Sequence, residues 1–168
     1  MRVAVTGTPG TGKTTATKRL DTDLDVVHLN EVVREEGLYD EVDEERDSVI
    51  ADIETVEERL GDRDDLVVDS HLAHHLDVDR VVVLRCHPEA VERRLRERGE
   101  SAAKAAENAE SEALDVILTE AVEGHGTDGV YEIDTTDRDP DEAAAEIEAV
   151  LAGEREPSAG TVSFIDYL

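Results

Sequence analysis

A short segment near the N-terminus combines glycines, a lysine and threonines in a pattern suited to holding phosphate. Residues 7–15 read GTPGTGKTT and match the pattern G-x-x-x-x-G-K-[ST] in full. Glycines let a backbone curl without Cβ clashes, so that successive N–H groups and a helix N-terminus point at an anion. In such a loop Lys13 is placed to bridge the terminal phosphates, and the Thr14 hydroxyl is placed to ligate Mg²⁺. The segment therefore predicts a nucleotide-phosphate site.

A second chemical group follows an apolar run. Residues 66–69 read LVVD, which is typical of a buried strand that ends in a carboxylate. In parallel α/β sheets the carboxyl ends of the strands meet at one edge, so Asp69 is predicted to lie beside the phosphate loop and to share the metal with Thr14. The alternative is a strand followed by an aspartate that only forms a turn.

The elements around these groups alternate between strands and helices. Residues 3–5 predict a strand before the loop, and residues 13–20 predict the start of a helix after it. Further strands are expected at about 26–29, 66–69, 81–84 and 130–133, and helices at about 30–36, 48–60, 89–98, 101–122 and 140–151. The long helix at 101–122 is expected to carry Leu114 on its apolar stripe. Five strands alternating with helices predict a three-layer α/β fold with a parallel sheet.

The composition limits the possible partners. The 168 residues suit a single domain, and 44 acidic against 17 basic residues give a formal net charge of −27. Because 39% of the residues are apolar, this charge indicates a folded protein with an acidic surface rather than disorder. We interpret it as adaptation to a salt-rich cytoplasm, although an acidic protein from an ordinary cell is the alternative. Broad electrostatic binding to nucleic acid is not expected, and a basic protein is the more natural partner.

Cellular location and redox chemistry are also constrained. The sequence has no run of 18 apolar residues and no signal-like N-terminus, so a cytoplasmic location without membrane contact is expected. The single cysteine, Cys86, allows no internal disulfide. Histidines at 71, 74 and 75 suggest zinc, but no Cys or Glu nearby completes a motif, so His74 and His75 are expected to face solvent.

Four segments, taken in order, resemble one family. They are residues 7–15, 34–40 (REEGLYD), 68–71 (VDSH) and 92–99 (ERRLRERG). Together they are similar to the atypical adenylate kinases, an archaeal and eukaryotic group whose eukaryotic members also act in maturation of the small ribosomal subunit. The match runs over roughly residues 1–136. The phosphate loop is shared by many nucleotide enzymes, whereas the second and third segments are more particular.

The resemblance implies a P-loop nucleoside monophosphate kinase fold with strand order 2-3-1-4-5. It also implies an acceptor-binding arm over about 28–51 and a short lid over about 97–107, which leaves a C-terminal tail at about 153–168. Asp69 and His71 would be the Asp-x-His pair linked to Mg²⁺ and to positioning of the attacking group. The residues implied to cradle ATP phosphates are Gly7, Gly10, Gly12, Lys13, Thr14, Thr15 and Arg98.

On the acceptor side the resemblance implies that Arg34 holds the phosphate of AMP. Tyr39 would either stack on the acceptor base or pack within the arm. A catalytic arginine is expected at Arg98 first and at Arg94 second, and a solvated helix face is the alternative for both. The resemblance departs at Glu100, where family members often carry an aromatic residue.

Three functions follow from these observations. The first is transfer of the γ-phosphate of ATP to AMP, with Mg²⁺ as cofactor and a possible ATPase activity. The second is an ATP-hydrolysing assembly factor that acts on a basic small-subunit ribosomal protein. The third, a nucleotide sensor without turnover, is disfavoured because Lys13, Thr14 and Asp69 are all present.

Overall fold

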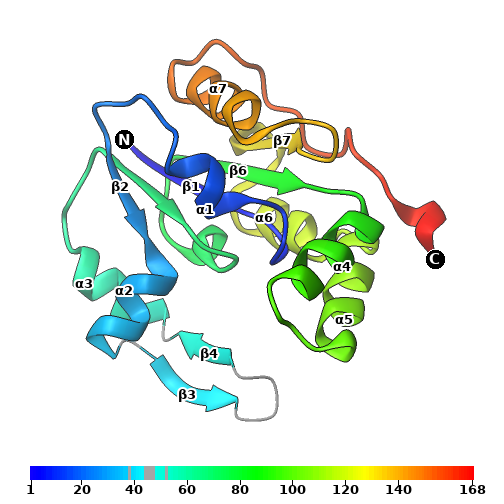
Figure 1. The fold of residues 1–168 in the computed structure, drawn as a ribbon. Coiled ribbons are helices and arrows are strands. Elements are labelled where there is room, and N and C mark those ends of the chain that lie inside the picture. Colours follow the sequence, from blue (N-terminus) through cyan, green and yellow to red (C-terminus); the bar gives the residue numbers. More distant parts are fainter. Residues whose placement is uncertain (38, 44–47, 52) are drawn as a thin grey trace.

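A five-stranded parallel sheet forms the centre of the computed structural model, which describes residues 1–37, 39–43, 48–51 and 53–168 (Figure 1). Its strands, in spatial order, are β2 (Asp25–His28), β5 (Leu66–Asp69), β1 (Arg2–Thr6), β6 (Arg80–Arg85) and β7 (Val130–Asp134). Counted along the chain within this sheet, the order is 2-3-1-4-5, as predicted. Because all neighbours run parallel, their carboxyl ends lie at one edge of the sheet.

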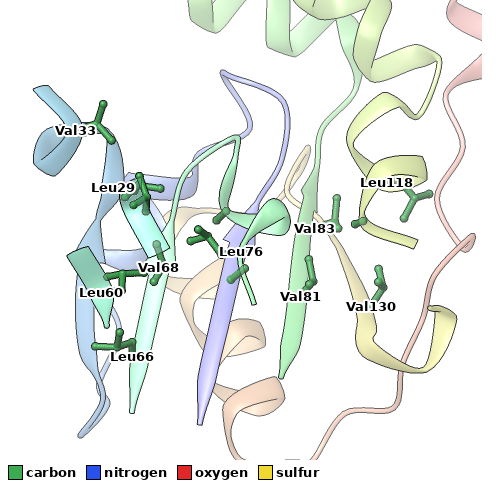
Figure 2. Close-up of a cluster of buried hydrophobic side chains, with 14 residues drawn as sticks. Leu29, Val33, Leu60, Leu66, Val68, Leu76, Val81, Val83, Leu118 and Val130 are labelled. Atoms are coloured by element: carbon green, nitrogen blue, oxygen red, sulfur yellow. The ribbon is translucent and has the colours of Figure 1, made fainter. Parts of the chain in front are cut away.

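Helices cover both faces of the sheet (Figure 1). They are α1 (Lys13–Thr17), α2 (Leu29–Glu36), α3 (Ile53–Leu60), α4 (Pro88–Glu97), α5 (Ala102–Ala113), α6 (Val116–His125) and α7 (Pro140–Leu151). Successive strand residues point to opposite faces, so each strand contributes to two cores. Figure 2 shows the core in which Val68 and Val83 meet Leu29 of α2 and Leu118 of α6. The other core packs alternate strand residues, such as Val67, against α1 and α7.

The predicted helix at 48–60 is wrong in its first turn. Residues Ser48–Ala51 form β4, which pairs antiparallel with β3 (Tyr39–Asp43), and the helix α3 begins at Ile53. The β-branched pair Val49 and Ile50 suits a strand, and a short apolar run does not by itself distinguish strand from helix. Pairing with β3 therefore decides that residues 48–51 form a strand.

The predicted long helix at 101–122 is two helices. α5 ends at Ala113 and α6 begins at Val116, because Asp115 has a left-handed backbone with φ of 56°. The Asp115 carboxylate accepts a hydrogen bond of 2.5 Å from buried Arg85, which offsets the cost of that conformation. Leu114 is therefore 49% exposed and does not lie on an apolar stripe.

The C-terminal tail lies beside β7. Ser158 donates its backbone N–H to the Val130 carbonyl, and the buried Glu132 carboxylate accepts N–H groups from Gly160 and Val162. The chain then ends in a short 3-10 helix, η3 (Ile165–Tyr167). Among the described residues, no helix is long and apolar enough to cross a membrane.

Candidate active site

The phosphate loop connects β1 to α1 and depends on glycine at defined positions. Gly12, with φ of 93°, directly precedes α1, and L-residues rarely adopt such an angle. A Cβ on Gly7 would lie 2.6 Å from the Leu84 carbonyl oxygen of the neighbouring strand. Because glycine has no Cβ at either position, the loop can curl tightly against the carboxyl end of the sheet.

Lys13 folds back onto this loop. Its Nζ donates hydrogen bonds to the carbonyl oxygens of Gly7 (2.9 Å) and Thr8 (3.1 Å). Burial lowers the pKa of the Lys13 ammonium to about 8, although the Asp69 carboxylate opposes this shift. A phosphate that replaces the two carbonyl oxygens would give the buried cation an anionic partner.

Asp69 ends β5 and joins the phosphate loop to β2. Its Oδ1 accepts a hydrogen bond from the Thr14 hydroxyl at 3.1 Å, and its Oδ2 accepts one from the Thr17 hydroxyl at 2.5 Å. The Nδ1 atom of His28 lies 2.5 Å from the same Oδ2. The structure therefore brings Thr14 and Asp69 together, as the sequence predicts.

Thr17 and His28 are contacts that sequence reasoning missed. A signal existed for each: Thr17 lies three residues after Thr14 on the same helix, and His28 ends β2, the strand beside β5. The strand register pairs His28 with Asp69. This register cannot be seen in the sequence, because it depends on which strands become neighbours.

The oxygen groups here fit a magnesium ion. Mg²⁺ prefers oxygen ligands and is commonly held by one or two protein oxygens together with substrate phosphates. The Thr14 hydroxyl and the Asp69 carboxylate, 3.1 Å apart, supply such oxygens at the mouth of the phosphate loop.

A cleft of about 200 Å³ opens above the loop. Three of its lining residues come from outside the loop and α1: Asn30 from α2, His71 after β5, and Arg98 at the end of α4. The loop side of the cleft is lined by Pro9, Gly10, Gly12, Lys13, Thr14 and Thr15. The structure thus brings His71 and Arg98 together with the phosphate loop.

His71 is uncharged near neutral pH. Its side chain is partly buried two residues beyond Asp69, and burial lowers its pKa to about 4, with the Lys13 charge acting in the same direction. A neutral imidazole can donate at one nitrogen and accept at the other, so it can orient an attacking oxygen without adding charge.

The two candidate arginines, Arg94 on α4 and Arg98 directly after it, take different positions. Arg98 is exposed and lines the cleft, whereas Arg94 donates to the Gly10 carbonyl oxygen (3.3 Å) and to the Thr135 carbonyl oxygen (3.5 Å). Arg94 also lines a second cleft of about 220 Å³. The two clefts share Gly12 and Thr15. The two clefts therefore lie next to each other at these two residues.

The predicted acceptor residues come from α2 and β3. Arg34 is exposed on α2, four residues after Asn30 and so on the same helix face, but it does not line the cleft. Tyr39 begins β3, and its side chain lies outside the described part of the chain. The predicted arm at 28–51 contains β3 and β4, which form a sheet separate from the central one (Figure 1).

Sequence reasoning also missed a buried carboxylate under the loop. Glu112 of α5 is 1% exposed and accepts hydrogen bonds from the Thr8 hydroxyl (3.0 Å), the Cys86 N–H (2.8 Å) and Arg85 Nε (3.2 Å). Burial alone lowers the pKa of Arg85, but Glu112, Asp115 and Glu132 outweigh it and raise that pKa. The loop is therefore tied to α5 and β6 by a charged network.

The expectation that His74 faces solvent is wrong. The His74 side chain is fully buried, with Nδ1 2.8 Å from the Thr6 hydroxyl and Nε2 3.1 Å from Glu120 Oε2. His75 is exposed, as predicted. The buried partners are distant in sequence, so no local pattern could have revealed them.

Comparison with solved structures defines the fold class of the protein. The chain superimposes on shikimate kinase from Acinetobacter baumannii with a TM-score of 0.58 at 16% identity, over 92% of this chain and 94% of that one. Deoxyadenosine kinase from M. mycoides gives a TM-score of 0.53 at 14% identity, over 90% of this chain and all of that one. With the phosphate loop and the 2-3-1-4-5 sheet, these similarities define the fold of a P-loop kinase.

Sequence comparisons then identify the family. Residues 3–115 match the family model described as an AAA domain. A protein of Halobacterium salinarum named "Putative adenylate kinase" is 66% identical over the full length of both chains, and one of Natronomonas pharaonis with the same name is 63% identical over both full lengths. A Methanocaldococcus jannaschii protein, also of that name, is 38% identical over all of this chain and 97% of its own. The chain belongs to the adenylate kinase family that these archaeal proteins represent.

Proposed function

We propose that the protein transfers the γ-phosphate of ATP to AMP and forms two molecules of ADP. The observation that carries this proposal is the single cleft that unites the phosphate loop with His71, Asn30 and Arg98. Phosphoryl transfer requires a protein mainly to align two phosphates and to neutralise charge on the transferring oxygens. The cleft contains groups for both tasks.

The donor nucleotide would occupy the two neighbouring clefts. The ATP phosphates would bind at Lys13 and the loop N–H groups, and the nucleoside would extend past Thr15 into the cleft beside Arg94. Thr14 and Asp69 would hold Mg²⁺, which when bound neutralises charge on the β- and γ-phosphates. Arg98 would contact the transferring phosphate from the end of α4.

The acceptor would enter along α2. Asn30 already lines the cleft, and Arg34 lies one turn further along the same face of that helix. A guanidinium can hold a monophosphate with two parallel hydrogen bonds, which suits the phosphate of AMP. The neutral His71 imidazole would orient the attacking phosphate oxygen.

ATP hydrolysis is a second candidate activity. The observation that favours it is the position of His71 in the cleft, where burial lowers its pKa to about 4. A neutral imidazole can orient water as well as a phosphate oxygen. In an assembly factor, this hydrolysis would drive binding to a basic ribosomal protein, and the net charge of −27 suits such a partner.

The decisive experiment follows the label from γ-labelled ATP with Mg²⁺ in multi-molar KCl, with and without AMP. We expect AMP to direct the label into ADP at a turnover within the usual range for enzymes, about 1–10³ per second. If the label appears as free phosphate whether or not AMP is present, the protein is an ATPase and the transfer proposal fails.

Two variants test the assigned roles. Arg98→Ala should lower kcat by about 10³-fold or more, because an arginine on the transferring phosphate contributes that much in related chemistry. Arg34→Ala should raise the KM for AMP by roughly tenfold or more while leaving the KM for ATP unchanged. Arg96→Ala, an exposed position on α4 outside the cleft, is the matched control for loss of one positive charge.

A further inference from the structure

Two histidines and a glutamate gather outside the clefts, where the 3-10 helix η1 (Ala73–His75) packs against α6. His74 Nε2 lies 3.1 Å from Glu120 Oε2, and His75 Nε2 lies 3.3 Å from the same oxygen. The three potential ligand atoms all lie within 4.8 Å of one another. None of these residues has a part in the proposed phosphoryl transfer.

His74 is held in the manner of a metal ligand. Its side chain is 0% exposed, its Nδ1 lies 2.8 Å from the Thr6 hydroxyl, and its carbonyl oxygen accepts a hydrogen bond from His125 Nε2 at 2.7 Å. If the Thr6 oxygen accepts the Nδ1 proton, the lone pair of Nε2 is directed toward Glu120. Metal-bound histidines are commonly oriented by such an acceptor on the second ring nitrogen.

The separations also suit a small metal ion. Bonds of about 2.0–2.1 Å in tetrahedral geometry place neighbouring ligand atoms roughly 3.3 Å apart. The two nitrogen–oxygen distances, 3.1 and 3.3 Å, are close to this value. The side chains of His75 and Glu120 are 41% and 36% exposed, so they can adjust around an ion and leave a path for its entry.

We propose that His74, His75 and Glu120 bind a divalent transition-metal ion of the zinc type, with water completing its coordination. Two imidazoles and one carboxylate favour such an ion, whereas Mg²⁺ prefers oxygen ligands alone. The ion takes the place of the proton that otherwise lies between Glu120 and a histidine nitrogen. It joins η1 to α6 and so stabilises η1, which contacts Thr6, the residue before the phosphate loop.

This metal site could not be predicted from the local sequence, because its ligands come from distant segments. Position 71 belongs to the phosphate cleft and not to this cluster. The carboxylate that joins the two remaining histidines comes from residue 120, which is 46 positions from His74. Only the packing of η1 on α6 brings it within reach.

The test measures metal binding by the full-length protein after treatment with a chelator. Zn²⁺ is titrated in multi-molar KCl against a chromophoric chelator, thermal unfolding is followed with and without Zn²⁺, and Co²⁺ is used as a spectroscopic probe. We expect one tight Zn²⁺ site, a higher Tm with Zn²⁺, intense visible absorption from tetrahedral Co²⁺, and no displacement by excess Mg²⁺.

Variants identify the ligands. His75→Ala and Glu120→Gln, both at partly exposed positions, should weaken Zn²⁺ binding by at least tenfold, since loss of a mere supporting partner already costs 10- to 100-fold. Glu123→Gln, exposed on the same helix, removes the same charge and should leave binding unchanged. Asp69→Asn should also leave it unchanged, which excludes the His28–Asp69 pair as the site.

Three results would overturn the proposal: no Zn²⁺ site that competes with the chelator, equal affinity in Glu120→Gln and Glu123→Gln, or loss of binding in Asp69→Asn with retention in Glu120→Gln. Each is independent of whether the protein phosphorylates AMP, because metal binding and not turnover is measured.

Discussion

Removal of the Glu112 carboxylate is predicted to destabilise the protein and to weaken the support of the phosphate loop. In Glu112→Ala, the Thr8 hydroxyl, the Cys86 N–H and Arg85 Nε each lose their acceptor inside the protein. Arg85 is 1% exposed but keeps its contacts with Asp115 and Glu132. The variant therefore leaves a buried network incomplete rather than a wholly unpaired charge.

The magnitude follows from these contacts. Removal of one partner from a buried ion pair costs about 3–5 kcal/mol when it leaves the other charge uncompensated. Because Arg85 keeps two carboxylate partners, Glu112→Ala should cost no more than the lower end of that range, about 3 kcal/mol. For a chain of this size that corresponds to a fall in Tm of about 6–12 °C. Glu112→Gln should cost less, about 1–2 kcal/mol, because its amide oxygen still accepts from Cys86 and Arg85 while its NH₂ can donate to the Thr8 oxygen.

Urea unfolding and the affinity for ATP are the two measurements. Glu112→Ala should lower the free energy of unfolding and weaken ATP binding, since Thr8 lies within the phosphate loop. Glu110→Ala, exposed on the same helix, is the control and should stay within about 0.5 kcal/mol of the wild type. The reasoning fails if Glu112→Ala unfolds like Glu110→Ala, or if Glu112→Gln is as damaging as Glu112→Ala.

Three further predictions concern charge. Because burial lowers the pKa of Lys13 to about 8 in the nucleotide-free protein, calorimetric affinity for a non-hydrolysable ATP analogue should fall as pH rises through 8; a constant affinity up to pH 9.5 would contradict this. The pKa of His71 falls from 6.5 to about 4 on folding, so the unfolded chain binds more protons in that window, and stability should drop by up to about 1.4 kcal/mol per pH unit as pH falls from 6.5 to 4. Urea unfolding of His71→Asn should lack that part of the pH dependence. With a net charge of −27, Tm should rise as KCl increases from 0.15 M to multi-molar, and a Tm independent of salt would refute self-repulsion as a destabilising factor.

Local sequence was sufficient to predict those features in which one short segment determines both the conformation and the functional groups. The glycines of residues 7–15 define a phosphate loop because their positive φ angles are intrinsic to that motif. The apolar strands and the helices between them predicted the parallel sheet, and the position of Asp69 at a strand end predicted its contact with Thr14. These inferences needed only periodicity, strand ends and one motif.

Contacts between distant segments were decided by tertiary structure alone. The burial of His74 depends on Thr6 and Glu120, and the support of Thr8 depends on Glu112, 104 positions away. The difference between Arg94 and Arg98 likewise arises from how α4 packs beside the phosphate loop, although the two residues are only four positions apart. The local sequence determines on which face of a helix or at which end of a strand a residue lies, because backbone geometry is local. Which groups meet there depends on how the elements pack, and that packing is a property of the whole chain.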